Sequence, residues 1–253
     1  ALLTSLTRRF SHGLQAAIHY TWSKAIGITN NSYDDSPRVQ ALQYFNLNRC
    51  VRDYDRAHNL AAASIWELPF GPGRHWLNQR GLASAVLGGW QVNNVLSFMS
   101  GRPFYASASG ASLDLPNSSQ RADQVKPKVE ILGGVGRGQS YFDPFAFKPV
   151  TEPRFGTAGF GALRGPGIVN WDFGVFREFA LKERLKLQFR AEAFNFSNTP
   201  HFSNPGTNVS NMTLNPDGTI RDLASYTEVT GTISLAREGI DERQFRVGIR
   251  FSF

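Results

Sequence analysis

The last eleven residues of the chain, 243–253, alternate without a break between apolar and polar side chains. A β-strand places successive side chains on opposite faces, so this segment has one apolar face and one strongly polar face. The apolar positions are Phe245, Val247, Ile249, Phe251 and Phe253. The ends of soluble chains usually fray into water, whereas this one closes on an aromatic residue. A strand of an outer-membrane β-barrel explains both properties, because one face meets lipid and the other meets a wet lumen.

The terminal aromatic residue also predicts how the strand is recognised. Phe253, with Phe251 and Ile249 at alternate positions before it, resembles the C-terminal signal of proteins that the barrel assembly machinery inserts into the outer membrane. These side chains project from one face and can be gripped in alternation, as in strand addition to an exposed sheet edge. We therefore expect this machinery as a partner, the outer membrane of a Gram-negative bacterium as the location, and a periplasmic C-terminus.

The composition is compatible with a barrel. The chain has 253 residues, of which 41% are hydrophobic, and its mean hydropathy is −0.29. No segment approaches the roughly eighteen continuous apolar residues of a membrane helix. Lipid-facing and lumen-facing residues of barrel strands cancel in any such average. The net charge of +7 would suggest nucleic acid as a partner of a soluble protein, but the basic residues are spread along strands and loops, so we expect no nucleic-acid partner.

Six further segments read as strands by their alternation, at residues 2–10, 14–25, 58–68, 90–98, 170–179 and 185–193. The short connections between strands (11–13, 69–88 and 180–184) all fall at one end, and the long irregular ones (26–56, about 104–167 and about 199–240) fall at the other. Residues 230–235 have the composition of a short strand inside the last loop. Short periplasmic turns and long extracellular loops are the pattern of bacterial barrels.

The predicted fold class is therefore all-β, an antiparallel up-and-down meander of about seven long strands. Spanning strands need about 9–11 residues, against roughly 5–6 in globular proteins. Single-chain bacterial barrels have an even number of strands and must close, so seven strands are expected to form part of a wall. Because the chain enters a predicted strand at residue 2 without a secretion signal, we expect residues 1–253 to be the C-terminal segment of a longer secreted protein.

Two sets of residues are predicted to lie on opposite faces of this wall, since a charge at the membrane midplane on the lipid side costs about 2–4 kcal/mol. The lumen-facing polar set is Arg246, Arg250, Arg190, Glu192, Gln188 and Asp172. The lipid-facing set is Phe245, Val247, Ile249, Phe251, Leu187, Phe189, Trp171, Phe173 and Val175. Aromatic girdles are expected at the outer rim, from Tyr20 and Trp22, and at the inner rim, from Trp90, Phe179, Phe251 and Phe253.

Several short motifs follow one another along the chain: Asp53–His58 (DYDRAH), Glu67–Gly71 (ELPFG), Leu87–Val92 (LGGWQV), Ser100–Phe104 (SGRPF), Leu163–Gly167 (LRGPG) with Asn170–Asp172 (NWD), and Leu187–Asn195 (LQFRAEAFN). In order and spacing they resemble the closing third of TonB-dependent outer-membrane receptors of the Oar-like kind. The resemblance implies a 22-stranded barrel with a plug inside it, often a carboxypeptidase-regulatory-like domain before the plug, and energy supplied by TonB through an N-terminal region that this chain does not contain. The transported solute would be large and is not identified by the resemblance.

Two of these motifs are expected to act at the rim of the barrel. Asp53, Asp55 and His58 could suggest a metal or acid–base cluster, but they lie where a loop becomes a strand, so a rim hydrogen-bond network is favoured. Asp55, Arg56 and His58 are the predicted rim residues of this motif. Arg164, Gly165 and Pro166 end a glycine-rich loop just before a strand and are expected to fold loop backbone over the barrel mouth, with a simple strand entry as the alternative.

The sequence predicts neither an enzyme nor a cofactor. The five histidines form no HExxH motif and no paired metal spacing, so no catalytic, cofactor-binding or metal residue is predicted. Residues 133–138 are rich in glycine but lack the strand–helix context of a phosphate loop, and Cys50 reads as an unreactive loop residue. The alternatives to a TonB-dependent receptor are a passive porin or adhesin-like barrel, and a soluble glycan-binding β-sandwich.

Replacing Phe253 with Ser should lower the amount of folded barrel in the outer membrane, because the terminal aromatic is part of the assembly signal. The stability of barrels that do fold should change little, since one rim aromatic at a chain end contributes modestly. Heat-modifiable migration of the full-length protein on gels measures the folded fraction in each case. Equal assembly of variant and parent would mean that Phe253 is only a girdle residue.

Overall fold

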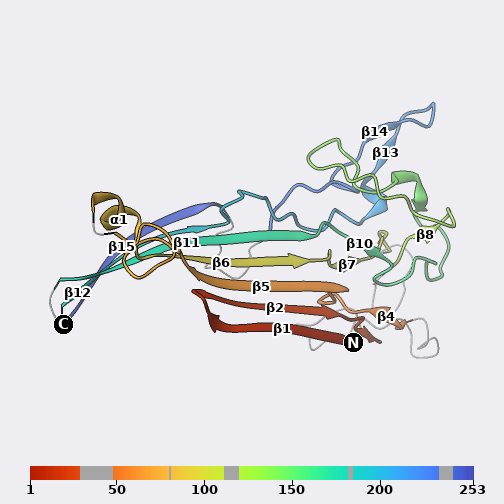
Figure 1. Cartoon of the computed structure of the whole chain (residues 1–253). Coiled ribbons are helices and arrows are strands. Elements are labelled where there is room, and N and C mark those ends of the chain that lie inside the picture. The colour runs from red at the N-terminus through yellow and green to blue at the C-terminus, as the bar shows by residue number, and fades with distance from the viewer. Residues whose placement is uncertain (29–47, 80, 111–119, 182–184, 234–241) are drawn as a thin grey trace.

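Seven long strands form one antiparallel sheet in the computed structural model, which describes residues 1–28, 48–79, 81–110, 120–181, 185–233 and 242–253. The strand order in the sheet is β1-β2-β5-β6-β11-β12-β15, so each long strand pairs with the long strands before and after it in the sequence (Figure 1). Their bounds are β1 (Leu2–Ser11), β2 (Leu14–Trp22), β5 (His58–Glu67), β6 (Trp90–Met99), β11 (Ile168–Ala180), β12 (Lys186–Phe194) and β15 (Gln244–Ser252).

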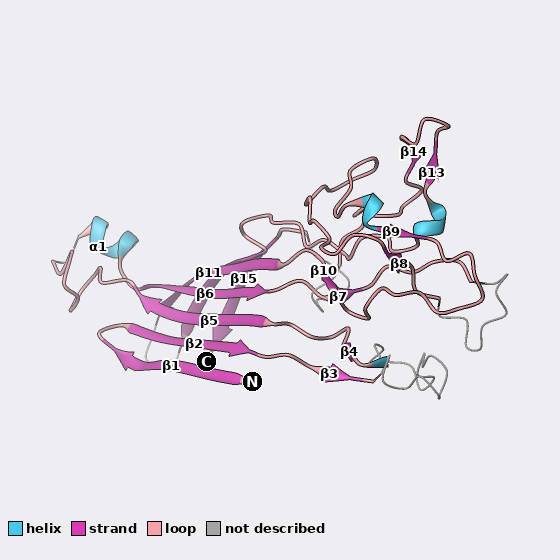
Figure 2. Cartoon of the chain, turned by 90° about the vertical axis from the view of Figure 1, so that its right-hand side faces the viewer, coloured by secondary structure: helices cyan, strands magenta, loops and turns pink. Residues whose placement is uncertain are grey.

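This arrangement confirms the predicted all-β fold and its meander of seven long strands. The strands contain between 9 and 13 residues, which is the length of spanning strands. The sheet is curved, and Figure 2 shows β15 turned behind the strands of the N-terminal half. Because all the long strands lie in a single sheet, the alternative of two sheets packed face to face is wrong for the described residues. The expected total of 22 strands stays a prediction.

The two ends of the sheet differ, as the loop lengths predict. The three short connections and the C-terminus lie at one end, on the left of Figure 1, together with helix α1 (Leu82–Leu87). The long connections gather at the opposite end, on the right. We call the first the inner end and the second the outer end. None of the described helices has the length and apolar character that a transmembrane span requires.

Glycines make the two described turns at the inner end possible. The β1–β2 hairpin turns at His12 and Gly13, whose φ angles are 52° and 80°, and two such residues match the twist of the flanking strands. In the β5–β6 connection Gly71 has a φ of 110°, and a Cβ there would lie 2.9 Å from the Cα of Gly88. The backbone therefore doubles back in close contact, which side chains at these positions would prevent.

Two strand boundaries differ from the predicted ones. The strand expected over 14–25 ends at Trp22, because the chain leaves the sheet and the N–H of Ala25 is bound instead by the carboxylate of Asp55, at 2.6 Å. The strand expected from residue 170 begins at Ile168, which pairs with Met99. Of the segment 230–235, Thr232 makes an isolated bridge with Phe202, while residues 234 and 235 lie outside the described part of the chain.

The long connections at the outer end fold into a body with its own core. It consists of the described residues of 103–164 and 202–232, and we call it the loop module. Short strand pairs join its segments: β7 (Pro103–Phe104) with β10 (Leu163–Arg164), β8 (Asp123–Gln124) with β9 (Phe147–Lys148), and β13 (Thr213–Leu214) with β14 (Ile220–Asp222). The 3₁₀ helices η3 (Pro144–Ala146) and η4 (Val209–Asn211) also belong to it, and β3 (Ile26–Gly27) pairs with β4 (Cys50–Val51) beside it.

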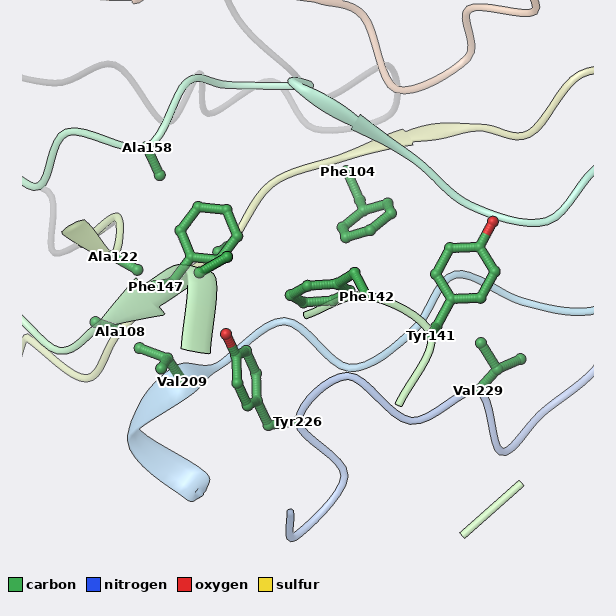
Figure 3. Close-up of a cluster of buried hydrophobic side chains, with 12 residues drawn as sticks. Phe104, Ala108, Ala122, Tyr141, Phe142, Phe147, Ala158, Val209, Tyr226 and Val229 are labelled. Carbon is green, nitrogen blue, oxygen red and sulfur yellow. The ribbon is translucent and has the colours of Figure 1, made fainter. Parts of the chain in front are cut away.

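The core of the loop module is aromatic. Phe142 is fully buried and meets the rings of Tyr226, Phe147 and Phe104 at centroid distances of 5.5, 6.0 and 5.5 Å (Figure 3). Alanine and valine side chains fill the remaining space. Because Phe104 and Phe142 belong to one connection and Tyr226 to the next, this core holds two loops together.

A buried ion pair supports the same module. Arg154 donates to both carboxylate oxygens of Asp123, at 2.9 and 2.6 Å, and the side chain of Asp123 is only 6% exposed. The hydrogen bonds from Arg154 are the main cause that holds the pKa of Asp123 below its usual range. The contribution of this pair to stability is thus present at neutral pH and is lost as the pH falls through the lowered pKa.

Replacing Phe142 with Ala should open the loop module. The cavity should cost about 3–5 kcal/mol, whereas Phe145→Ala, at a neighbouring residue that is 42% exposed, should cost far less. Limited proteolysis of the full-length protein in membranes reports the open population of the loops. We expect rapid cleavage within the loops of the Phe142 variant while the sheet stays protected, and equal cleavage of the two variants would contradict this role of the core.

Candidate functional site

The strand register defines an apolar face of the sheet. Directly paired residues of antiparallel strands point to the same side. Leu187 pairs with Phe251, and Phe189 pairs with Ile249. The register continues this face across the sheet, so that it contains all nine residues of the predicted lipid-facing set: Phe245, Val247, Ile249, Phe251, Leu187, Phe189, Trp171, Phe173 and Val175.

The opposite side is the polar face. The register brings together there all six residues predicted to face the lumen: Arg246, Arg250, Arg190, Glu192, Gln188 and Asp172. Glu192 lies directly opposite Arg246, and Gln188 lies opposite Arg250. Arg190 donates to Gln188 at 3.1 Å and lies across Gly248, where a Cβ would be only 3.2 Å from its side chain. That this face meets a lumen stays a prediction.

Two strand residues on the apolar face, Ser64 and Asn94, carry polar side chains that bond among themselves. The indole Nε1 of Trp171 donates to Asn94 Oδ1 at 3.1 Å, and Asn94 Nδ2 donates to Ser64 Oγ at 3.4 Å. A polar group that faces hydrocarbon needs such an internal partner, because no water is there to replace it. The row Ser64–Asn94–Trp171 thus meets a requirement that a water-facing surface would not impose.

The predicted girdle aromatics lie at the two ends of this apolar face. Tyr20 and Trp22 end β2 at the outer end, where the Tyr20 hydroxyl lies 2.8 Å from His58 Nδ1. Trp90 and Phe179 lie at the inner end, near Phe251. That they form two aromatic belts at the membrane interfaces stays a prediction.

The rim motifs converge on a buried ion pair at the outer end. Arg164 donates to Asp55 Oδ2 at 2.5 Å, although 108 residues separate them in sequence, and the side chain of Asp55 is 1% exposed. The other carboxylate oxygen of Asp55 binds the N–H of Ala25, and Arg164 also donates to the carbonyl oxygen of Gly101 at 3.1 Å. Two connections are therefore tied together by one carboxylate and one guanidinium.

Arg56 and His58 extend this rim network. Arg56 Nη1 donates to the carbonyl oxygen of Ser100 at 2.6 Å, and the N–H of His58 donates to Ser100 Oγ at 3.1 Å. Burial, followed by the nearby charges of Arg102 and Arg164, lowers the pKa of Arg56 to about 10. Asp55, Arg56 and His58 thus each make hydrogen bonds at this rim, and Arg164 is a partner that sequence spacing could not identify.

Gly165 and Pro166 bring loop backbone into close contact at the same place. A Cβ at Gly101 would lie 1.7 Å from the carbonyl oxygen of Gly165, and the N–H of Gly165 donates to the carbonyl oxygen of Arg102 at 3.0 Å. Asn204, from the third long connection, donates to the carbonyl oxygen of Pro103 at 3.3 Å. The glycines of the two motifs are needed because the backbones touch.

The loop module contains a polar cavity of about 700 Å³ that sequence reasoning missed. Its lining includes Arg137 and Arg221, while both carboxylate oxygens of Glu228 are already bound, by the N–H groups of Gly138 and Ser225. Ala224, Ser225 and Thr227 beside it have φ angles of 44°, 74° and 63°. Such strain in residues other than glycine persists only where the surrounding structure enforces it, and it often accompanies binding sites.

Cys50 and the glycine-rich segment 133–138 both make contacts with loop backbone. Cys50 is buried with its sulfur 3.6 Å from the carbonyl oxygen of Gly27, and burial raises its pKa. Over the described ranges, no group of three His, Cys, Asp or Glu side chains could hold a metal ion. The N–H of Gly136 donates to the carbonyl oxygen of Val229, so at this position the glycine-rich segment 133–138 serves loop packing.

One comparison with known proteins gives a match. The family model described as an outer membrane beta barrel domain matches residues 1–245. The match covers the first six long strands and reaches the start of β15. Neither the curated proteins nor the solved structures contain a match to the chain.

Replacing Asp55 with Asn should loosen the outer rim. The amide keeps the shape but leaves Arg164 without its carboxylate. Removing one partner of a buried pair costs about 3–5 kcal/mol, and we expect about 2–3 because the Arg164 side chain keeps 32% exposure. Hydrogen exchange at the amide of Ala25 measures the opening.

The matched control is Glu178→Gln, which removes an exposed pair with Lys186 at 2.7 Å. This change should cost less than about 1 kcal/mol and leave exchange at Ala25 unchanged. Equal protection of Ala25 in the parent and the Asp55 variant would show that the ion pair does not hold the rim.

Proposed function

The chain belongs to the family of outer membrane beta barrel domains, and from this membership we propose that it is the C-terminal wall segment of a TonB-dependent receptor that actively transports a large solute. The protein is an outer-membrane barrel protein. The proposal adds that the apolar face meets lipid, that the polar face lines the lumen, and that the loop module lies outside the cell. The inner end and the C-terminus are then periplasmic.

The facing follows from the cost of the opposite arrangement. With the polar face toward lipid, Arg190, Arg246 and Glu192 would be exposed to hydrocarbon, at about 2–4 kcal/mol for each midplane Arg and less for Glu. The apolar face would then expose Phe and Val side chains to water. With the proposed facing, Arg190, Arg246 and Glu192 lie away from hydrocarbon, and the row Ser64–Asn94–Trp171 is satisfied internally.

The edges of the sheet support a larger wall. Among the described residues, β1 pairs only with β2 and β15 pairs only with β12, so one side of each edge strand has unpaired backbone groups. Each such group costs several kcal/mol in lipid, and further strands must therefore continue the sheet at both edges. The resemblance to Oar-like receptors supplies the proposed total of 22.

The convergence of the rim motifs is the observation that carries the receptor assignment. Asp55, Arg56, Gly101, Arg164 and Gly165 come from separate motifs of the resemblance, and they meet in one network at the outer rim. We further propose that the chain has no catalytic role, that the barrel assembly machinery folds it, and that TonB acts through an N-terminal region of the whole protein.

A passive porin or adhesin-like barrel is the alternative, because it would have the same wall without a plug. Conductance of the full-length protein in planar lipid bilayers separates the two. A receptor whose plug fills the lumen should be silent, and deletion of its N-terminal region should open a large, steady conductance. Steady conductance of the intact protein would favour the porin and contradict the receptor.

A further inference from the structure

We propose that helix α1 is a membrane anchor, which lies in the interface of the periplasmic leaflet and buries Leu82, Val86 and Leu87 among phospholipids. The inference rests on the proposed facing of the apolar face toward lipid. It concerns the β5–β6 connection at the inner end, which plays no part in the rim network or the loop module.

Two side chains of the apolar face hold the helix. Arg177 and Trp90 are direct partners in the β6–β11 register, and both lie on the apolar face. Arg177 Nη1 and Trp90 Nε1 both donate to the carbonyl oxygen of Val86, at 2.7 and 2.9 Å, and Arg177 Nη2 donates to the carbonyl oxygen of Ala85. The helix is therefore held on the proposed lipid side of the sheet, at the inner end where Figure 1 shows it.

The helix turns its apolar side chains outward. Leu82, Val86 and Leu87 are 87, 62 and 52% exposed, whereas Ser84 is its one buried residue. A helix of six residues is unstable alone in water and normally depends on burying an apolar face. No described residue covers this face of α1. Because the adjoining apolar face of the sheet is proposed to meet lipid, lipid would cover the apolar side chains of α1 as well.

The last carbonyl groups of the helix have partners within the protein. The last carbonyl groups of a helix lack partners within it and are hydrated when they face solvent. Here the carbonyl oxygens of Ser84, Ala85 and Val86 accept from Gly88, Arg177 and Trp90 instead. Two of these donors, Arg177 and Trp90, belong to β11 and β6, so the helix end is tied to the sheet.

The surroundings of Arg177 match a membrane interface as well. Its guanidinium lies 4.3 Å from the ring centroid of Phe179 and 5.4 Å from that of Trp90. Trp90 in turn meets the ring of Phe189 edge-on at 6.1 Å. Aromatic rings with an interleaved cation are typical of the headgroup level of a bilayer.

Fluorescence quenching by labelled lipid tests the anchor. The full-length protein, in a Cys50→Ala background, would carry one environment-sensitive fluorophore on a cysteine at position 82 and be reconstituted in phosphatidylethanolamine–phosphatidylglycerol vesicles. We expect severalfold stronger quenching by nitroxide on the lipid headgroup than by iodide in the buffer. Gln79→Cys, on an exposed polar residue of the same connection, should show the reverse.

Two further labels separate failure of the anchor from failure of the facing. Ile249→Cys, on the apolar face, should be quenched by nitroxide on the acyl chain, and Arg246→Cys, on the polar face, should not. If Ile249 is quenched by lipid while Leu82→Cys is quenched only by iodide, the helix faces the periplasm or a periplasmic protein, and the anchor is overturned while the facing stands. If Ile249 is not quenched by lipid, the facing fails and the anchor fails with it.

Arg177→Gln, introduced into the proteins labelled at position 82 or at position 249, gives a second measurement. Losing the guanidinium should free the helix, so quenching of the label at position 82 by headgroup nitroxide should fall severalfold while that at Ile249 is unchanged. Unchanged quenching at both positions would overturn the role of Arg177 in holding α1 at the lipid surface.

Discussion

The structure depends on the backbone hydrogen bonds between neighbouring long strands, which follow the order β1-β2-β5-β6-β11-β12-β15. In hydrocarbon every backbone N–H and C=O group of a strand must bond to a neighbouring strand. Long, continuously paired antiparallel strands meet this requirement. This requirement also fixes the side chains, because a slip by one residue would move Arg190 and Arg246 to the apolar face. The strand register therefore fixes both the pairing of the strands and the face of the sheet on which each side chain lies.

The loops at the outer end are governed by a different rule. Water can satisfy their backbone, so no ladder is imposed, and their order comes instead from a small aromatic core and from buried ion pairs. Phe142 and Tyr226 join two connections, while Asp55 and Arg164 join the first connection to the second. Because these contacts bridge all three long connections, the loop module can hold a polar cavity with a strained wall at Ala224, Ser225 and Thr227.

Sequence alone was sufficient for the sheet and insufficient for the loops, for a physical reason. Strand periodicity is local, so β12 and β15 could be located within a residue or so of their ends and their faces assigned. The ends of β2 were harder, since the carboxylate of Asp55 takes the amide that would have continued the strand. Asp55 and Arg164 are 109 positions apart, with β5, β6 and most of the second long connection between them. No local sequence pattern could therefore identify them as partners. The cavity at Arg137 and Arg221 is equally nonlocal, because it forms only when two connections pack together.

The contacts that hold α1 at the inner end could not be predicted from the local sequence either. Gly89, directly after the C-cap Gly88, takes the left-handed conformation common at helix ends, with a φ of 76°, but α1 has no basic residue in its last turn. The cation comes from Arg177 on β11, which lies 91 positions after Val86 in the sequence. Arg177 is also the one residue that breaks the apolar pattern of β11, where Val175 and Phe179 flank it on the same face. A charge on an otherwise lipid-compatible face is costly unless it has internal partners, and two helix carbonyls with two aromatic rings provide them. Arg177, the charged residue in this apolar pattern, is thus the residue through which β11 holds α1.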